Sequence, residues 1–242
     1  MFGMKKYWKT PGGSVWTLYK NMTAENHLLI GGATGSGKSV VINGIISTLL
    51  HDSPSTVQLV LIDPKRVELI AYKDLPHTIR HATEPETIVQ ALQQALTLTD
   101  KRYSEMAARR IKTYDGSHVY VIIDELADLM TTDKRRVQPL IQRLAQIGRA
   151  ARVHVIAATQ CPLASVIPTA IGVNFDSRVA LRTRNAQDSR NILGTTGCEL
   201  LPRYGQGFFR TADGVQLYRI PMVSDSDIDF LISWWTSRKC MA

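Results

Sequence analysis

The segment GGATGSGKS, from Gly31 to Ser39, has the residue types and spacing of a phosphate-binding loop. It matches the pattern GxxxxGK[ST] and lies between the apolar stretches HLLI and VVINGII. Glycines let a backbone wrap around a phosphate without Cβ clashes, and N–H groups of the loop and of the following helix then point at the anion. Lys38 would reach the β- and γ-phosphates of a nucleotide, and Ser39 would bind Mg²⁺. The predicted nucleotide-binding residues are Gly32, Ala33, Thr34, Gly35, Ser36, Gly37, Lys38, Ser39 and Val40.

Two acidic residues follow the apolar run VYVII, where a buried strand would end. Asp124 would hold Mg²⁺ through water, and Glu125 would polarise the attacking water as general base. An adjacent Asp-Glu pair favours ATP hydrolysis over a slow GTP switch, and the chain has no base-reading NKxD string. Gln160 closes the next apolar run, VHVIAATQ, and either senses the γ-phosphate or is a polar strand end. The sequence therefore predicts an ATP hydrolase that uses ATP and Mg²⁺.

The segments around the phosphate-binding loop and the acidic pair have the patterns of buried strands and amphipathic helices. Val-, Ile- and Leu-rich runs without polar alternation indicate strands buried on both faces, which is typical of a parallel sheet covered by helices. Strands are expected at 27–32, 57–63, 119–125, 153–160 and 178–183, and a hairpin at 205–220. Helices are expected at 38–52, 85–110, 135–151 and 224–239. The predicted fold is α/β with a mostly parallel central sheet flanked by helices, followed by a C-terminal β-hairpin and helix.

Composition narrows the class of protein. The chain has 242 residues, 29 Lys and Arg against 21 Asp and Glu, and a net charge of +8. This charge suits a polyanion such as nucleic acid or an anionic membrane face, or is simply a solvated surface. Three cysteines without metal-ligand spacing argue against a disulfide scaffold and a zinc site, and the N-terminus lacks the apolar region of a signal peptide. The cysteine usage favours the reducing cytoplasm as the location, and no apolar run is long enough to cross a membrane.

Several strings together resemble the motor domain of the FtsK/SpoIIIE DNA translocases. They are HLLIGGATGSGKSVVING, LVLIDPKRVEL, KRYSEM, VIIDELADLM, RLAQIGRAARVHVIAATQ and DSRNILG, in the family's order, over roughly residues 27–209. The resemblance implies a RecA-like P-loop ATPase that assembles as a homo-hexameric ring around double-stranded DNA. A membrane-anchored or DNA-processing partner is left open.

The resemblance also implies roles for individual residues. Lys38 and Ser39 would bind the nucleotide and Mg²⁺. Asp124 and Glu125 would act on the metal and the attacking water, and Gln160 would sense the nucleotide. Arg149 falls where the family places an arginine finger that reaches the neighbouring subunit's nucleotide. The candidate DNA contacts are Arg178, Arg182, Arg184 and Arg190. Cys161, Gly172 and Ala186 stand where the family has basic residues, so the pore charge is relocated or thinned.

The chain divides into a short N-terminal β-hairpin or edge segment, residues 1–26, and a RecA-like ATPase domain, residues 27–242. Strings of a separate ring-forming or winged-helix domain are absent, which leaves a stand-alone or an excised motor. The leading hypothesis is an ATP-driven DNA translocase. Alternatives are a conjugative or viral DNA-packaging ATPase, a protein-secretion ATPase of the same superfamily, and a non-motor nucleotide-binding protein.

Overall fold

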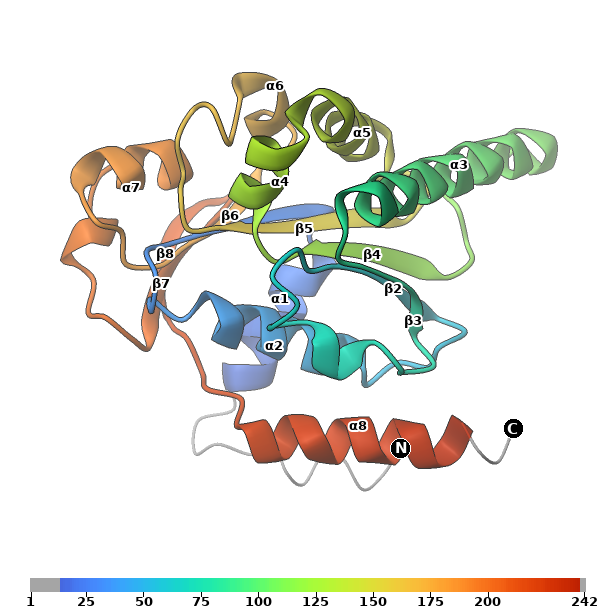
Figure 1. Ribbon diagram of the computed structural model, residues 1–242, viewed down its shortest axis with the longest axis horizontal. Helices are drawn as coiled ribbons and strands as arrows, with labels where there is room; N and C mark the ends of the chain where they lie inside the picture. Colours follow the sequence, from blue (N-terminus) through green and yellow to red (C-terminus); the bar gives the residue numbers. More distant parts are fainter. Residues whose placement is uncertain (1–13, 240–242) are drawn as a thin grey trace.

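The computed structural model of the chain describes residues 14–239, which form an eight-stranded sheet covered on both faces by helices (Figure 1). The strand order is β3-β2-β4-β5-β1-β6-β7-β8. The strands are β1 (His27–Gly31), β2 (Val57–Ile62), β3 (Thr78–Ala82), β4 (His118–Ile123), β5 (Val153–Thr159), β6 (Ser177–Ala180), β7 (Gln206–Thr211) and β8 (Gly214–Arg219).

Strand pairing places the ends of the central strands at one edge. All pairs from β3 to β6 are parallel, whereas β6–β7 and β7–β8 are antiparallel. Gly31 at the end of β1 is in register with Thr159 of β5 and Ala180 of β6. Loops that leave these strands therefore meet at one edge, where open α/β sheets bind ligands.

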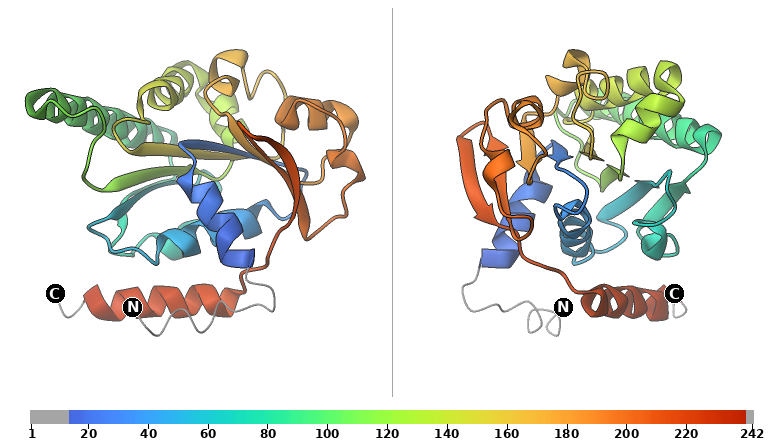
Figure 2. Two further views of the ribbon diagram at one scale, coloured as in Figure 1. Left: turned by 180° about the vertical axis from the view of Figure 1, so that it is seen from behind. Right: turned by 60° about the vertical axis from the view of Figure 1, so that its left-hand side comes forward.

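Helices lie on both faces of the sheet, as Figure 2 shows from two further sides. One layer contains α1 (Ser14–Ala24), α2 (Lys38–Leu49), the 3₁₀ helix η2 (Ile70–Tyr72) and α8 (Asp225–Lys239). The other contains α3 (Pro85–Arg109), α4 (Leu126–Thr132), α5 (Lys134–Ile147), α6 (Thr169–Gly172) and α7 (Ala186–Leu193), while the 3₁₀ helix η3 (Cys198–Leu200) follows α7. A separate apolar cluster fills the space between the sheet and each layer.

The apolar pattern of α2 shows why it packs on the sheet. Val41, Ile42, Ile45 and Ile46 are fully buried, as the i, i+3, i+4 spacing of its apolar residues predicts. At the far side of this layer, the indole N–H of Trp235 in α8 donates a 2.9 Å hydrogen bond to the carbonyl of Leu50. This contact holds α8 against the end of α2.

The expected fold class, the parallel strands, the C-terminal hairpin and the closing helix are confirmed. The expected N-terminal hairpin or edge strand is wrong for residues 14–24, which form α1, whereas residues 1–13 lie outside the described part of the chain. Tyr19 explains the difference, because its ring lies over Gly44 of α2 and its hydroxyl donates a 2.7 Å hydrogen bond to the Pro221 carbonyl. The sequence also gave no signal for β3, an edge strand of mixed burial.

Across residues 14–239, the structure contains no helix that is both long and apolar enough to span a bilayer.

Candidate active site

The predicted phosphate-binding loop connects β1 to α2 at the carboxyl edge of the sheet. Gly35 has φ of 70° and Gly37, the residue before α2, has φ of 100°, and this left-handed conformation strains any other residue. A Cβ on Gly32 would lie 2.5 Å from Oγ of Ser36 and 2.8 Å from Cβ of Leu181. The glycines are therefore required by backbone shape and by close packing.

Neighbouring strands hold this loop in place. The N–H of Gly32 donates to the Thr159 carbonyl at 3.3 Å, and the N–H of Ala33 donates to the Arg182 carbonyl at 2.8 Å. Inside the loop, Nζ of Lys38 donates to the carbonyls of Gly32 at 2.9 Å and Ala33 at 3.1 Å. Burial lowers the pKa of Lys38 to about 8, against the opposing pull of nearby carboxylates. The loop is thus a preformed cradle with a cation at its centre.

The first turn of α2 completes the cradle. Lys38, Ser39 and Val40 are its first residues, and the first N–H groups of a helix have no intrahelical acceptor. These donors and the positive end of the helix dipole favour an anion. The residues that the sequence predicted for nucleotide binding therefore form one continuous segment, which is the loop and the first turn of α2.

Asp124 lies at the end of β4, next to the cradle. Its side chain is nearly buried, and burial together with repulsion from Glu68 and Asp63 raises its pKa to about 7. Asp63, at the end of β2, is fully buried and accepts a 3.0 Å hydrogen bond from the N–H of Leu69. A buried carboxylate in an acidic surrounding suits a divalent cation, and Ser39 on α2 supplies a hydroxyl oxygen of the kind that Mg²⁺ takes. The donor set therefore fits the expected metal.

Glu125 is held in one orientation by four hydrogen bonds. Its Oε1 accepts from Oγ1 of Thr159 at 2.8 Å and from the N–H groups of Ala127 and Gln160 at 3.2 Å each. Its Oε2 accepts from the Gln160 N–H at 3.1 Å. The residue is 2% exposed. A buried carboxylate fixed in this way is preorganised to accept a proton from a water molecule.

A hydrogen bond between Thr34 and Gln160, the residue after β5, connects this strand to the phosphate-binding loop. Oγ1 of Thr34 donates a 2.6 Å hydrogen bond to Oε1 of Gln160. The backbone of Gln160 contacts the general base candidate Glu125 at the same time. Gln160, the predicted sensor, thus contacts both the phosphate-binding loop and Glu125.

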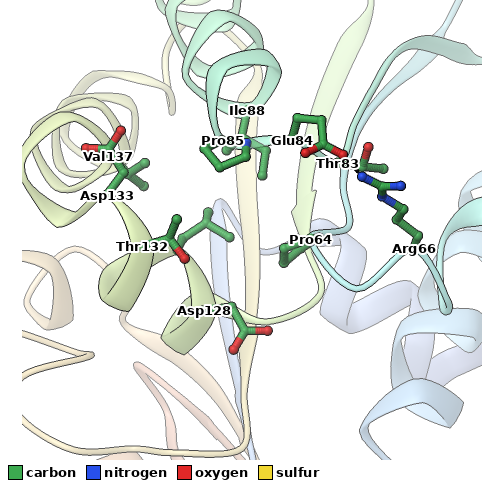
Figure 3. Close-up of a pocket in the computed structure, with 11 residues that line it drawn as sticks. Pro64, Arg66, Thr83, Glu84, Pro85, Ile88, Asp128, Thr132, Asp133 and Val137 are labelled. Atoms are coloured by element: carbon green, nitrogen blue, oxygen red, sulfur yellow. Dashed lines mark ion pairs between the residues drawn. The ribbon is translucent and has the colours of Figure 1, made fainter.

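Lys65 joins this cluster, although its sequence position gave it no role. Its Nζ lies 3.8 Å from Oε2 of Glu125 and 3.3 Å from Oδ2 of Asp128. Lys65 belongs to the IDPK string that carries part of the family resemblance, but the sequence gave no physical role for it. A cavity of about 160 Å³ lies beside this group, and Figure 3 shows Asp128 and Arg66 among its lining residues.

Arg149 lies away from this site, in the turn between α5 and β5, and its side chain is exposed. It lines a cavity of about 480 Å³ together with Tyr103, His118, Arg152 and His154. Because the other end of β5 carries Thr159, Arg149 lies at the opposite edge of the sheet. It cannot serve the nucleotide of its own subunit.

The four arginines proposed as DNA contacts have different surroundings. Arg178 is half-buried, and its guanidinium donates to the carbonyls of Phe175, Gly172 and Ile192. Because its guanidinium is occupied by these backbone carbonyls, the structure does not support Arg178 as a DNA contact. Arg182, Arg184 and Arg190 are exposed, and Arg184 forms a 3.0 Å ion pair with Asp188.

Cys161, Gly172 and Ala186, where the family resemblance implied basic residues, have different surroundings. The N–H of Cys161 donates to Oγ1 of Thr159 at 3.1 Å. The Gly172 carbonyl accepts from Arg178 at 2.7 Å, and Ala186 begins α7.

Comparisons with known proteins agree with this geometry. The family model described as "FtsK/SpoIIIE family" matches residues 11–120 and 113–164. The "DNA translocase FtsK" of Helicobacter pylori strain 26695 is 37% identical over 230 residues, covering 88% of this chain and 27% of that protein. The chain thus spans about a quarter of that relative's length.

Solved structures share the fold at lower identity. The pCW3 conjugation coupling protein TcpA, in its monomer form with ATPγS, is 22% identical with a TM-score of 0.77, over 86% of this chain and 64% of that one. The cytoplasmic domain of the Thermomonospora curvata type VII secretion ATPase EccC is 21% identical with a TM-score of 0.74, over 87% of this chain and 28% of that one. At these identities the likeness concerns the fold alone.

Proposed function

The chain belongs to the FtsK/SpoIIIE family, and we propose that it is the ATP-hydrolysing motor of a translocase for double-stranded DNA. One observation carries this proposal: the carboxylate of Glu125 is fixed beside a preformed phosphate-binding loop. A protein that only binds nucleotide has no need for such a base. The motor would work in the cytoplasm, where ATP and DNA are both present.

In this proposal the loop and the first turn of α2 bind the phosphates of ATP, with Lys38 neutralising their charge. Ser39 and Asp124 would hold Mg²⁺, and the bound ion would supply charge neutralisation for the phosphates. Glu125 accepts the proton of the attacking water. Gln160 leaves Thr34 to contact the γ-phosphate, which couples the state of the nucleotide to β5.

Arg149 requires a second subunit in this scheme. Arg149 lies beside the amino ends of the parallel strands, whereas the phosphate-binding loop lies at their carboxyl ends. It therefore reaches a nucleotide only when the amino-end side of one subunit packs on the carboxyl-end side of the next. Such head-to-tail contacts close into rings when the rotation allows it. A homo-hexamer is the ring that the family resemblance implies.

DNA would be held through its phosphates. The net charge of +8 favours a polyanion, and the exposed Arg182, Arg184 and Arg190 are the remaining candidates. A motor that moves along any sequence needs phosphate contacts and not base contacts.

A pump for protein substrates, or a packaging or conjugative motor, is the second candidate. Arg178 is engaged inside the fold, and Gly172 and Ala186 carry no charge, so the basic surface is sparse in this region. A salt-sensitive response to duplex DNA separates these readings, because phosphate contacts weaken steeply with salt.

The test is the ATPase rate with and without duplex DNA over a range of salt, run beside native mass spectrometry. We expect stimulation by DNA that declines with salt, and loss of hydrolysis in Lys38→Ala and Glu125→Gln. A rate that ignores duplex DNA at every salt concentration would contradict the DNA role, and stimulation by a peptide substrate instead would favour the protein pump.

The trans arrangement has its own test. Arg149→Ala and Glu125→Gln should each be inactive alone, yet a mixture should regain activity, since some interfaces then combine an intact Glu125 with an intact Arg149. Arg143→Ala, an exposed arginine on α5, is the matched control and should stay active. A mixture as inactive as its components would argue against a finger in trans.

A further inference from the structure

The connection between η3 and β7, residues 201–205, lies against the phosphate-binding loop. A Cβ placed on Gly35 would lie 3.2 Å from Nη2, 3.7 Å from Nε and 3.9 Å from Cζ of Arg203. Three atoms of one guanidinium therefore line the loop at its middle glycine. No pattern in the sequence pointed to Arg203, which is 168 positions from Gly35 along the printed chain.

Both ends of this connection are fixed to the fold. Leu201 is buried in a small apolar cluster with Ile192 and Leu193 of α7. At the other end, the Gly205 carbonyl accepts a 2.9 Å hydrogen bond from the N–H of Ile220. The short exposed segment between these anchors has little freedom to move away from the loop.

Arg203 is also oriented within the segment. Its Cζ lies 5.2 Å from the ring centroid of Tyr204, within the range of a cation–π contact. Both side chains are exposed, and Tyr204 is 61% exposed. Pro202 restricts the backbone just before them. The ring contact and the restricted backbone both favour a position of the guanidinium beside the loop.

The charge of Arg203 has no acidic partner within residues 14–239. Two other arginines in this half of the chain differ from it, since Arg184 pairs with Asp188 and Arg178 donates to carbonyls. An oriented guanidinium without an acid, placed on a phosphate-binding loop, matches the planar, multiply donating group that recognises phosphate oxygens.

We propose that Arg203 binds a phosphate group of the nucleotide in its own subunit, and that Tyr204 positions its guanidinium. This inference rests on the nucleotide site of the proposed function and adds a residue outside the loop and the acid pair. It assigns Arg203 a role in cis, which differs from that of Arg149.

The experiment measures the affinity of the whole chain for ATPγS and for ADP by calorimetry, with Mg²⁺ and without DNA. A charge-assisted hydrogen bond to phosphate corresponds to a loss of ~10-fold or more in affinity when it is removed. Arg203→Ala should show this loss with an unchanged melting temperature, because the side chain is exposed. Arg203→Lys should retain part of the affinity. The matched control is Arg219→Ala, an exposed arginine on β8.

Tyr204 is tested by the same titration. Tyr204→Phe keeps the ring and should bind as the wild type does, whereas Tyr204→Leu should weaken binding by a smaller factor than Arg203→Ala. If Phe and Leu weaken binding equally, the ring does not position the arginine.

The outcomes separate this inference from the proposed function. The inference is overturned if the Arg203→Ala variant binds both nucleotides with an affinity within about twofold of that of the wild type. If that variant loses only the stimulation of hydrolysis by DNA, Arg203 is a DNA contact instead. Conversely, weakened nucleotide binding together with a wild-type ATPase that ignores DNA supports Arg203 and contradicts the translocase. A wild-type chain that binds neither nucleotide overturns both.

Discussion

Replacing Thr159 by Val removes the shortest hydrogen bond to Glu125 and keeps the shape of the side chain. The bond is 2.8 Å long and entirely buried, because Thr159 is 0% exposed and Glu125 is 2% exposed. The same hydroxyl accepts from the N–H of Cys161, which would lose its partner. Thr159 is therefore a positioning residue for the proposed base and not a group that touches ATP.

Hydrogen bonds to charged groups contribute about 1.5–3 kcal/mol. If all of this energy served the transition state, kcat would fall by ~10- to ~100-fold. Because the N–H groups of Ala127 and Gln160 still hold the carboxylate, we expect the lower end, about 10-fold. Nucleotide affinity should stay unchanged, since the phosphate-binding loop does not contact the threonine hydroxyl.

The assay compares kcat with the dissociation constant of ATPγS. Thr159→Ser keeps the hydroxyl and should restore most of the rate. Thr99→Val is a matched control, because Thr99 is equally buried and its hydroxyl donates to the Ala95 carbonyl in α3. If Thr159→Val and Thr99→Val lose the same stability and both keep wild-type kcat, the hydrogen bond does not position the base, and the reasoning is refuted.

Three further variants test the fold around the site. Gly32→Ala should abolish nucleotide binding in a calorimetric titration, because the new methyl would lie 2.5 Å from Oγ of Ser36; retained binding would contradict the close packing. Gly44→Ala should lower the free energy of unfolding by about 1–3 kcal/mol in urea, since the methyl meets the ring of Tyr19, and an unchanged midpoint would show that α1 is not packed as described. His27 has a pKa lowered by burial to about 4, below its unfolded value, so unfolding takes up a proton and stability is lost as pH falls from about 6.5 toward 4. Between pH 6.5 and 5 this loss is about 2 kcal/mol for one such group, and His27→Asn should show a smaller loss than wild type in the same urea titrations.

The sequence predicted the parts of this molecule that depend on local pattern. Buried parallel strands appear as continuous apolar runs, and acids or glycines at their ends mark the ligand edge of the sheet. Asp124, Glu125 and Gln160 were found in this way, and the structure brings all three to the loop at Lys38.

Features that depend on contacts far apart in sequence could not be predicted. The turn signal before α1 indicated a hairpin. Leu18 and Met22, however, lie four positions apart on one face of a helix and are buried in the apolar cluster between the sheet and α2. Basic residues give no indication of their burial, so Arg178 was grouped with exposed arginines. The position of Arg203 depends on a loop that only the folded hairpin brings near Gly35.

Strand β5 leads from the turn that carries Arg149 to the residues that hold Glu125, and this constrains how the proposed motor can couple its subunits. β5 begins four residues after Arg149 and ends at Thr159, whose hydroxyl and following amide hold Glu125. All seven residues of β5 are buried, and the strand is hydrogen-bonded on both sides by β1 and β4. In the proposed motor, engagement of Arg149 by a neighbour's phosphate would be transmitted along β5 as a displacement of the Thr159–Gln160 end relative to the phosphate-binding loop. The hydrogen bond between Thr34 and Gln160 crosses this boundary, which makes it the contact where a signal from the neighbouring subunit would meet the signal from the bound nucleotide.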